Sequence, residues 1–332
     1  MTQSSTPPPT SKAPDAQPAT SERTWTVLEL LQWTTDYLKR NGVEGARLDA
    51  EVLLAHALSM SRLDLYLNYE NPVSAVDRTT FRELVQKRAQ QRIPVSLLLG
   101  EREFWSMKLT VTSDVLTPRP ETELLVSTAL DAMPDPDYAY QVLDLGTGSG
   151  AIALAIASER PNAIVTATDI STFALKVARL NAEQLQLCDR VQFVEGSLFA
   201  AVSGEVFDLV ISNPPYVARA EQDALPRELS HEPELALFGG DDGYAVLKPL
   251  VSEVGAALND GGLFLVELDP RQADTVASWC REAEMTSVKV LHDLSGHARV
   301  VSARHGSDGE GQKKKPTGSE AGASMDAGED SR

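Results

Sequence analysis

Between about residue 140 and residue 303, strand patterns alternate with helix patterns, and this alternation constrains the fold more than any other feature. It is typical of a parallel sheet covered by helices on both faces. The last two strand segments are close enough in sequence for a hairpin, so the final strand is expected to be antiparallel. The expected strands are Gln141–Leu145, Ile164–Asp169, Val191–Glu195, Phe207–Ser212, Leu263–Leu268, Val288–Leu291 and Ala298–Ala303. The expected helices are Gly150–Arg160, Ser171–Leu185, Gly243–Leu258 and Asp269–Ala283. The chain therefore predicts an α/β protein with a seven-stranded, Rossmann-like sheet.

A small helical domain is predicted ahead of the sheet, over residues 23–99. Its first helix begins at Thr26, because Thr26 and Glu29 have capping-box spacing, and Gly42 marks its end. Later helices are expected at Leu48–Leu58, Leu63–Asn68 and Asp77–Gln91. Residues 100–118 are predicted to be a linking β-hairpin, and residues 119–304 the second domain. The hairpin strands are expected at 105–111, where apolar and polar residues alternate, and at 115–116.

Composition narrows the class of protein further. The ends, residues 1–22 and 305–332, lack apolar periodicity and are expected to be disordered. Neither a membrane span nor a secretory signal is recognisable, and Cys188 and Cys280 lie far apart, so a cytoplasmic protein is expected. The histidines have no metal-ligand spacing, so no metal is predicted. The net charge of −18 disfavours direct nucleic-acid binding and suits a basic partner.

A glycine-rich turn joins the first expected strand to the first helix of the sheet. Its glycines are Gly146, Gly148 and Gly150, with Thr147 and Ser149 between them. Glycine permits a tight turn and close ligand approach, and the helix N-terminus offers free N–H groups. Two acids flank the turn in sequence: Asp144 precedes it, placed to meet a cationic group, and Asp169 ends the next strand, suited to accept two ribose hydroxyls.

A nucleoside with a cationic amino-acid tail fits these residues, which points to S-adenosylmethionine as the cofactor. A nicotinamide nucleotide is the alternative, but the spacing is GxGxG rather than GxGxxG. The alternative without a ligand is a glycine turn that serves only the packing of the helix on the sheet. The sequence therefore predicts an S-adenosylmethionine-dependent methyltransferase fold with an N-terminal helical domain and a linking hairpin.

The fourth expected strand ends in the segment Asn213-Pro214-Pro215-Tyr216. Ligands bind at the carboxyl ends of strands in such folds. Prolines lack N–H groups, which leaves the Pro214 carbonyl as an acceptor beside the side-chain oxygen of Asn213. Two adjacent acceptors match the two donors of an NH₂ group, and Tyr216 can stack on a flat group. The segment therefore predicts a clamp for a planar amide or base amine, although Asn-Pro is also an ordinary turn pattern.

Such a nitrogen is a weak nucleophile because its lone pair is delocalised. Two fixed acceptors favour a pyramidal nitrogen whose lone pair points at the sulfonium methyl. Catalysis would then rest on positioning and electrostatic preorganisation. No general base is needed before transfer, because the extra proton becomes acidic only once the nitrogen is methylated.

Seven segments in a fixed order make residues 25–304 resemble the HemK-type peptide chain release factor N5-glutamine methyltransferases. They are RLDAEVLLA (Arg47–Ala55), RIPVSLLLGEREFW (Arg92–Trp105), VLTPRPETELLV (Val115–Val126), DLGTGSGAIALA (Asp144–Ala155), SNPPYV (Ser212–Val217), HEPELALFGGDDG (His231–Gly243) and DLSGHARVV (Asp293–Val301). The resemblance implies methylation of the glutamine nitrogen in the GGQ loop of release factors. We expect a monomer whose helical domain docks that partner.

The resemblance also implies roles for individual residues. Gly146 to Gly150, Asp169 and Asn213 would hold the cofactor, with Ser197 and Leu198 beside the adenine. The segment Asn213–Tyr216 would hold the glutamine amide. Three residues of PRPETE would cap the pocket and seat the GGQ loop: Arg119, Glu121 and Glu123. Acids are also common in the first turn of a helix, so the two glutamates could instead serve only to stabilise the helix N-terminus. The chain departs from the family pattern at Ser197, Leu198 and Asp269.

Three alternatives stay open on the residues alone. A second glutamine methyltransferase family, acting on a ribosomal protein, shares NPPY and the glycine turn but lacks the PRPETE wording. An N6-adenine nucleic-acid methyltransferase has a similar clamp but needs a basic groove. A non-catalytic binding module could keep the same fold.

Overall fold

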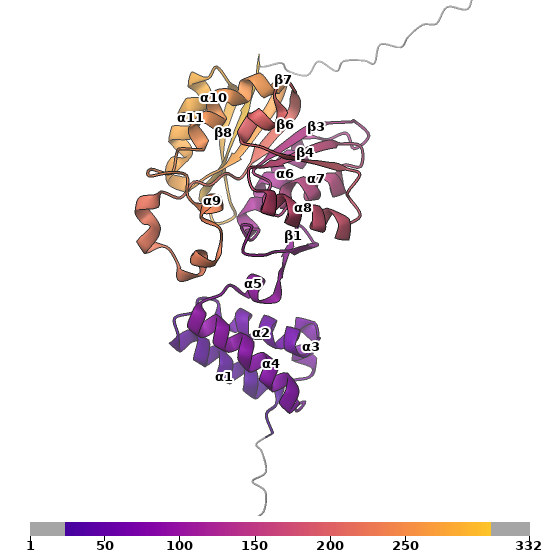
Figure 1. Ribbon diagram of the computed structural model, residues 1–332, viewed down its shortest axis with the longest axis vertical. Helices are drawn as coiled ribbons and strands as arrows, with labels where there is room; N and C mark the ends of the chain where they lie inside the picture. The colour runs from indigo at the N-terminus through magenta and orange to yellow at the C-terminus, as the bar shows by residue number, and fades with distance from the viewer. Residues whose placement is uncertain (1–23, 307–332) are drawn as a thin grey trace, which may run out of the picture. The chain divides into compact units, whose positions relative to one another are not determined.

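The structure is a computed structural model that describes residues 24–306. The segments expected to be disordered, 1–22 and most of 305–332, lie outside the described residues. The chain divides into two compact units between Leu98 and Leu99, here called the helical unit and the sheet unit. Each is described by itself, with the element labels of Figure 1.

The helical unit is a small bundle around a leucine core. The helix α1 begins after Thr26, whose side chain accepts from the Glu29 N–H in the expected capping box. Its buried face packs against α2 around fully buried leucines. The elements are α1 (Val27–Arg40), α2 (Ala46–Ala57), α3 (Arg62–Leu67), α4 (Ala75–Gln86), the π-helical turn η1 (Lys87–Gln91) and α5 (Val95–Leu99), which ends at the unit boundary.

The sheet unit contains the predicted seven-stranded sheet, in the order β5-β4-β3-β6-β7-β9-β8. Neighbours are parallel from β5 to β7, whereas β9 runs antiparallel to both β7 and β8. The strands are β3 (Gln141–Leu145), β4 (Ile164–Asp169), β5 (Val191–Glu195), β6 (Phe207–Ser212), β7 (Leu258–Glu267), β8 (Thr286–His292) and β9 (Ala298–Arg304). The α/β fold and the antiparallel final strand are confirmed.

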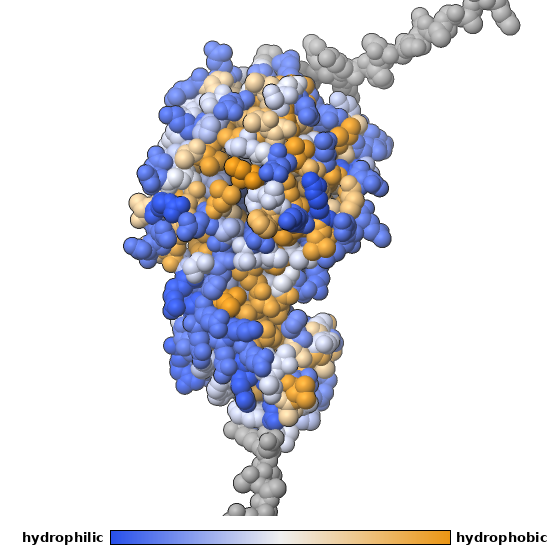
Figure 2. All heavy atoms as spheres, viewed as in Figure 1, coloured by the Kyte–Doolittle hydropathy of each residue, from blue (hydrophilic) through white to orange (hydrophobic). Residues whose placement is uncertain are grey.

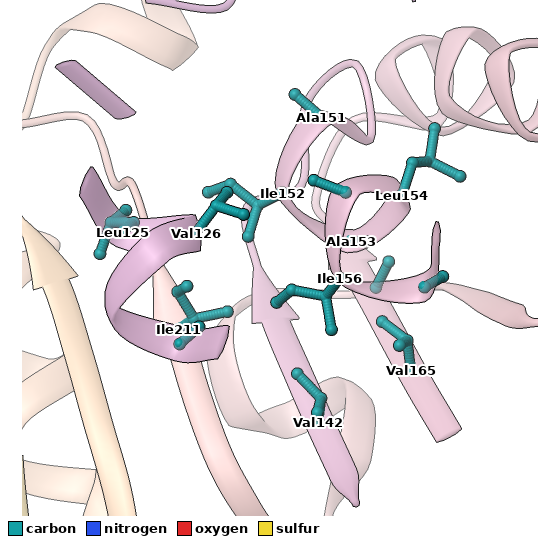
Figure 3. Close-up of a cluster of buried hydrophobic side chains, with 14 of the residues drawn as sticks. Leu125, Val126, Val142, Ala151, Ile152, Ala153, Leu154, Ile156, Val165 and Ile211 are labelled. Carbon is teal, nitrogen blue, oxygen red and sulfur yellow. The ribbon is translucent and has the colours of Figure 1, made fainter. Parts of the chain in front are cut away.

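Helices cover both faces of the sheet, because successive side chains of each buried strand point to opposite faces. Val142 packs in one apolar cluster with α6 (Glu123–Ala132) and α7 (Ala151–Glu159), as Figure 3 shows, and α8 (Thr172–Gln184) lies at the edge of this layer. Leu143 packs on the other face with α10 (Leu247–Glu253) and α11 (Ala273–Glu282).

The linking hairpin differs from the prediction. Its strands are β1 (Glu101–Phe104) and β2 (Met107–Thr110), joined by a turn at Trp105 and Ser106, and the segment 115–116 forms no strand. Both turn residues have positive φ, 50° and 56°, which is unusual outside Gly, Asn and Asp. The expected partner strand was wrong because this turn carries none of those residues.

Two helix boundaries also differ from the prediction. The segment 243–258 was expected to be one helix, but Gly243 has φ 83°, and α10 begins only at Leu247. The turn η6 (Val254–Ala257) then leads directly into β7. The helix expected from Glu121 begins as the 3₁₀ turn η2 (Pro120–Thr122), which α6 continues. Shorter turns complete the sheet unit: η3 (Leu198–Val202), η4 (Arg219–Ala224), η5 (Arg227–His231), α9 (Glu234–Leu237) and η7 (Pro270–Gln272).

Candidate active site

A cavity of about 450 Å³ lies at the carboxyl ends of β3, β4, β5 and β6. The strand order reverses between β3 and β6, and ligands bind at such switch points in open α/β sheets. The cavity collects most of the predicted site residues: Arg119, Gly146, Thr147, Gly148, Ser149, Asp169, Ser197, Leu198, Asn213, Pro214 and Pro215.

The glycines of the turn do two different jobs. Gly146 and Gly148 have positive φ, 73° and 54°, and a Cβ on either would meet nothing within 4 Å. Since both line the cavity, a side chain there would occupy ligand space. Gly150 instead packs closely, because its Cβ would stand 3.1 Å from Leu154 Cδ1 and 3.2 Å from Ala178 Cβ. The first two glycines thus leave room for a ligand, and the third lets α7 and α8 approach.

The two predicted acids are placed differently. Asp169 borders the cavity, and its oxygens accept from the Gly148 and Ser171 N–H groups at 2.9 and 2.8 Å. Asp144 is fully buried under the turn and does not line the cavity. Its Oδ2 accepts from Thr147 Oγ1 at 2.6 Å and from the Ala153 N–H at 3.1 Å. Asp144 therefore caps the first turn of α7 and fixes the glycine turn from below.

Burial raises the pKa of both carboxyl groups. For Asp144 the pKa reaches about 7, although the bonds from Thr147 and Ala153 oppose the shift. For Asp169 the bonds from Ser171 and Gly148 oppose it in the same way. An ionised Asp169 keeps spare acceptor capacity, because its two oxygens offer about four lone pairs and accept from three backbone N–H groups, those of Gly148, Ile170 and Ser171.

The end of β6 presents Asn213 with its oxygen free. Its Nδ2 donates to Thr122 Oγ1 at 3.1 Å, whereas its buried Oδ1 has no hydrogen-bond partner. Within residues 24–306, no backbone hydrogen bond outside helices and strands ends on the Pro214 carbonyl. Ser212, just before, donates to the Leu145 carbonyl at 2.8 Å and ties β6 to β3. Two neighbouring acceptors thus stand at the cavity, as the clamp hypothesis requires.

A second glycine-rich segment supports the back of this clamp. A Cβ on Gly239 would stand 2.5 Å from the Pro215 carbonyl oxygen, and one on Gly243 would stand 2.5 Å from that of Tyr216. Gln272 Nε2 donates to the carbonyls of Tyr216 and Gly243, each at 3.1 Å. The backbone after Asn213 is therefore held at distances that only glycine permits.

Besides Asp144 and Gly150, three more predicted site residues lie away from the cavity lining. Tyr216 packs against the apolar cluster under α10 and α11, and burial raises its pKa. Glu123 accepts from the Trp105 N–H at 3.0 Å, so it holds the hairpin turn, and Glu121 is exposed at the start of η2. Their proposed contacts with a substrate stay predictions.

Arg119 has a partner that the sequence did not reveal. Its Nη2 donates at 2.5 Å to Glu232, whose carboxylate is fully buried. Burial raises the pKa of Glu232, and Arg119 and Thr117 oppose the shift. This ion pair fastens the segment around η5 and α9 to the PRPETE segment beside the cavity. Since the two partners lie 113 residues apart, only the three-dimensional structure shows the pair.

Besides polar residues such as Asp114, Thr122 and Ser171, thirteen apolar side chains line the cavity and were not predicted. They are Val115, Leu116, Pro118, Ala151, Ile152, Ile170, Ala174, Pro233, Leu235, Ala236, Ala245, Val246 and Pro249. Mostly apolar walls with a few fixed polar groups are usual for a cofactor cavity. Of these apolar residues, only Ile170 directly follows a predicted strand, so only Ile170 could have been predicted from its position in the sequence.

The residues present fit S-adenosylmethionine. Open space at Gly146 and Gly148 admits a ligand, Asp169 has acceptor capacity, and the free Oδ1 of Asn213 is an orphaned buried acceptor. Residues 24–306 contain no group of three His, Cys, Asp or Glu side chains arranged for a metal ion. No helix in the same range is long and apolar enough to cross a membrane.

The fold and the cavity define an S-adenosylmethionine-dependent methyltransferase. Residues 29–100 match the family described as PrmC N-terminal domain, and residues 120–240 match the methyltransferase small domain. The hMettl16 catalytic domain, solved with a MAT2A 3′UTR hairpin, has a TM-score of 0.52 at 14% identity, covering 68% of this chain and 82% of that one. That likeness shows the fold.

Sequence relatives are more specific. The release factor glutamine methyltransferase of Rhodopirellula baltica is 41% identical, covering 84% of this chain and 96% of that protein. The protein of the same name from Geobacter sulfurreducens is 40% identical over 85% of this chain and 98% of its own length. The chain belongs to the release factor glutamine methyltransferase family, which confirms the resemblance seen in the sequence.

Proposed function

We propose that the protein transfers a methyl group from S-adenosylmethionine to the side-chain amide nitrogen (N5) of the glutamine in the GGQ motif of peptide chain release factors, supporting translation termination. The observation that carries the proposal is the buried Oδ1 of Asn213, which has no hydrogen-bond partner and belongs to a residue that lines the cavity. A buried acceptor without a donor is costly, so it indicates a ligand that supplies one.

Asn213 and Pro214 would act as a pair. The Oδ1 of Asn213 and the Pro214 carbonyl accept the two N–H groups of the glutamine amide, which holds the nitrogen and turns its lone pair toward the cofactor. When bound, S-adenosylmethionine supplies an electrophilic methyl group. Gly146 and Gly148 would leave room for it, Asp169 would accept its ribose hydroxyls, and Ser197 and Leu198 would border its adenine; all five residues line the cavity. The nitrogen loses its extra proton to water after transfer.

Two alternative substrates are less well supported. An exocyclic base amine would fit the same two acceptors, but the chain carries a net charge of −18, which disfavours a nucleic-acid groove. A ribosomal-protein glutamine would also fit the clamp. The relatives at about 40% identity carry the release factor name, which favours the release factor. A monomer is part of the same proposal, and a cytoplasmic location follows from the proposed substrate.

The helical unit is proposed to dock the release factor. Three of its apolar side chains are strongly exposed: Leu63 at 68%, Leu67 at 74% and Val76 at 75%. Figure 2 shows apolar residues on the surface of this unit at the position of α3. Exposed apolar groups that gather on one face are common at protein interfaces.

Mass spectrometry tests the proposed function. The purified protein is incubated with a release factor and methyl-labelled S-adenosylmethionine, and the GGQ peptide is analysed. We expect one methyl group on the GGQ glutamine and none on a release factor with GGQ changed to GGA. Label on DNA or on a ribosomal protein, with an unmodified GGQ, would replace this proposal with one of the two alternatives.

A further inference from the structure

We infer that Glu267 and Thr122 are positioning residues, which hold the Asn213 amide so that its oxygen, and not its nitrogen, faces the substrate. The inference rests on the proposed function only for the identity of the substrate. The three residues come from different elements: Glu267 ends β7, Thr122 ends η2 and Asn213 follows β6. β6 and β7 are neighbours in the sheet, so Glu267 and Asn213 leave adjacent strand ends.

The hydrogen bonds among the three side chains form a closed set. Asn213 Nδ2 donates to Thr122 Oγ1 at 3.1 Å, and Glu267 makes side-chain hydrogen bonds with both Thr122 and Asn213. An ionised carboxylate only accepts, so the Thr122 hydroxyl donates to Glu267. The two N–H groups of Asn213 are then both used, one by Thr122 and one by Glu267.

This arrangement decides which end of the amide reaches the cavity. A flipped Asn213 would turn its NH₂ toward the donors of the substrate amide and its oxygen toward the Glu267 carboxylate. Both contacts would be repulsive, and both hydrogen bonds would be lost. Glu267 and Thr122 therefore select the one orientation in which Oδ1 is free, as the structure has it.

The burial of the Glu267 carboxyl group supports a positioning role. Glu267 is 2% exposed, between the buried Val266 and Leu268, and its Oε2 has no hydrogen-bond partner. A carboxyl group in such a place is unfavourable for the fold alone, and a neutral residue would pack there at lower cost. Its retention is explained if an acceptor-only group is needed to orient Asn213.

The orientation should depend on pH. Burial raises the pKa of Glu267 to about 7, opposed by Thr122, Arg299 and Asn213, while the nearby Glu121 adds to the shift. Tyr216 also faces Glu267, and Arg299 comes from β9. Above this pKa the carboxylate accepts from both partners. Below it the neutral acid is a weaker acceptor than the carboxylate, so the hydrogen bonds that fix Asn213 weaken.

Three variants test the inference with the full-length protein and a whole release factor. Thr122→Val keeps the shape and removes the hydroxyl, and Thr122→Ser restores it. Glu267→Gln keeps the shape but adds a donor. We expect Thr122→Val and Glu267→Gln to lower kcat roughly 10- to 100-fold with KM within about twofold, as for a misplaced catalytic group. Thr122→Ser should recover most of the loss, and the exposed Glu205→Gln serves as control.

The pH profile separates positioning from a merely structural role. Wild-type kcat should rise with a midpoint near pH 7, the pKa given to Glu267, and the Glu267→Gln profile should lack that step. Values of kcat within twofold of wild type for both Thr122→Val and Glu267→Gln, with the step retained, would overturn the inference.

A readout without substrate keeps the inference distinct from the proposed function. With ¹⁵N-labelled asparagine, the Asn213 side-chain NH₂ signals, assigned through Asn213→Ser, should exchange slowly with water and shift with a midpoint near pH 7. Fast exchange in the wild-type protein would refute the positioning role even if release factors are methylated. Slow exchange without methylation of any release factor would refute the proposed substrate instead.

Discussion

The residues proposed to bind the substrate amide lie at the end of β6, and their amino-acid types alone predicted this role. Two prolines and an asparagine indicate acceptors without donors, and the structure places Asn213 and Pro214 at the cavity. Their orientation was not predictable, because Thr122 lies 91 residues away from Asn213. Asp144 was misleading for a related reason. An acid at a strand end can point into the cavity or under the helix, and only the alternation of β3 decides between them.

Removal of the Asn213 oxygen should abolish most of the activity. Asn213→Ala takes away one of the two acceptors, and loss of one preorganised polar group costs about 100- to 1,000-fold in kcat. The cofactor should still bind within a few-fold of wild-type affinity, as measured by calorimetry, because most residues proposed to hold it lie at the ends of β3 and β4. Asn162→Ala, an exposed asparagine, is the control. Activity of Asn213→Ala within tenfold of wild type would contradict the clamp.

The Asp144 carboxyl group should make stability fall as pH rises. Its pKa is about 7 in the folded protein against a reference value of 3.8. The folded state thus keeps a proton that the unfolded chain has lost, so the contribution is complete below about pH 4 and lost as pH rises to 7. One pKa unit corresponds to about 1.4 kcal/mol, so the effect is a few kcal/mol at most.

Thermal unfolding without cofactor, from pH 5 to pH 8, measures this effect. Asp144→Asn should gain stability relative to the wild-type protein as pH increases, because the variant has no carboxyl group to ionise. The comparison cancels the carboxyl groups that do not interact with Asp144, and so leaves Asp144 and its interaction with Asp169. A difference that stays constant over the range would show that Asp144 does not titrate there.

Elements of the sheet were the best predicted part of the structure. The bounds of β3, β4, β5 and β6 agree with the prediction, because each is a short segment rich in β-branched and apolar residues between clear turn patterns. The hairpin was missed because Trp105 and Ser106 adopt positive φ without a Gly or Asn. The helix before β7 was predicted to be too long, because Gly243 packs against Tyr216 and its carbonyl accepts a hydrogen bond from Gln272, and both residues lie far from it in sequence.

The different surroundings of the glycines in the turn between β3 and α7 predict different effects of alanine substitutions. Gly150→Ala should destabilise the sheet unit by about 1–3 kcal/mol through overpacking against α8, in addition to backbone strain. Gly148→Ala meets no atom within 4 Å, so it should lose mainly cofactor affinity. Gly204→Ala is the matched control, because Gly204 has φ 86° in open space away from the cavity.

Urea unfolding and calorimetry with S-adenosylmethionine distinguish the three alanine variants. Gly204→Ala reports the strain of a positive φ alone, about 1–2 kcal/mol. The stability loss of Gly150→Ala should exceed that value, and the affinity loss of Gly148→Ala should exceed that of Gly204→Ala. Equal effects in all three proteins would mean that the glycines serve only the turn.

In the whole molecule, the two units have different proposed functions: the sheet unit forms the cavity and the helical unit docks the partner. The sheet unit alone supplies every residue that lines the cavity. The helical unit has its own leucine core and a buried Glu51 that accepts from Arg47, Arg62 and Tyr66, so its fold does not depend on the exposed apolar residues of α3. Those residues are therefore available for a partner, as the proposed docking role requires.

The double variant Leu63→Gln/Leu67→Gln tests this division. Glutamine keeps helix propensity and net charge, and both leucines are more than two-thirds exposed, so the fold should be retained. We expect KM for a whole release factor to rise roughly tenfold, as for the loss of an apolar contact at an interface. KM for a short GGQ peptide should not change, because such a peptide reaches only the cavity.

The comparison of two substrates makes the result decisive. Val206→Gln, which removes an exposed apolar side chain from the sheet unit, is the control and should leave both KM values unchanged. A rise in KM for the peptide as well would place the effect in the cavity and not in docking. If KM for the whole release factor stays the same, the helical unit does not bind the partner through α3.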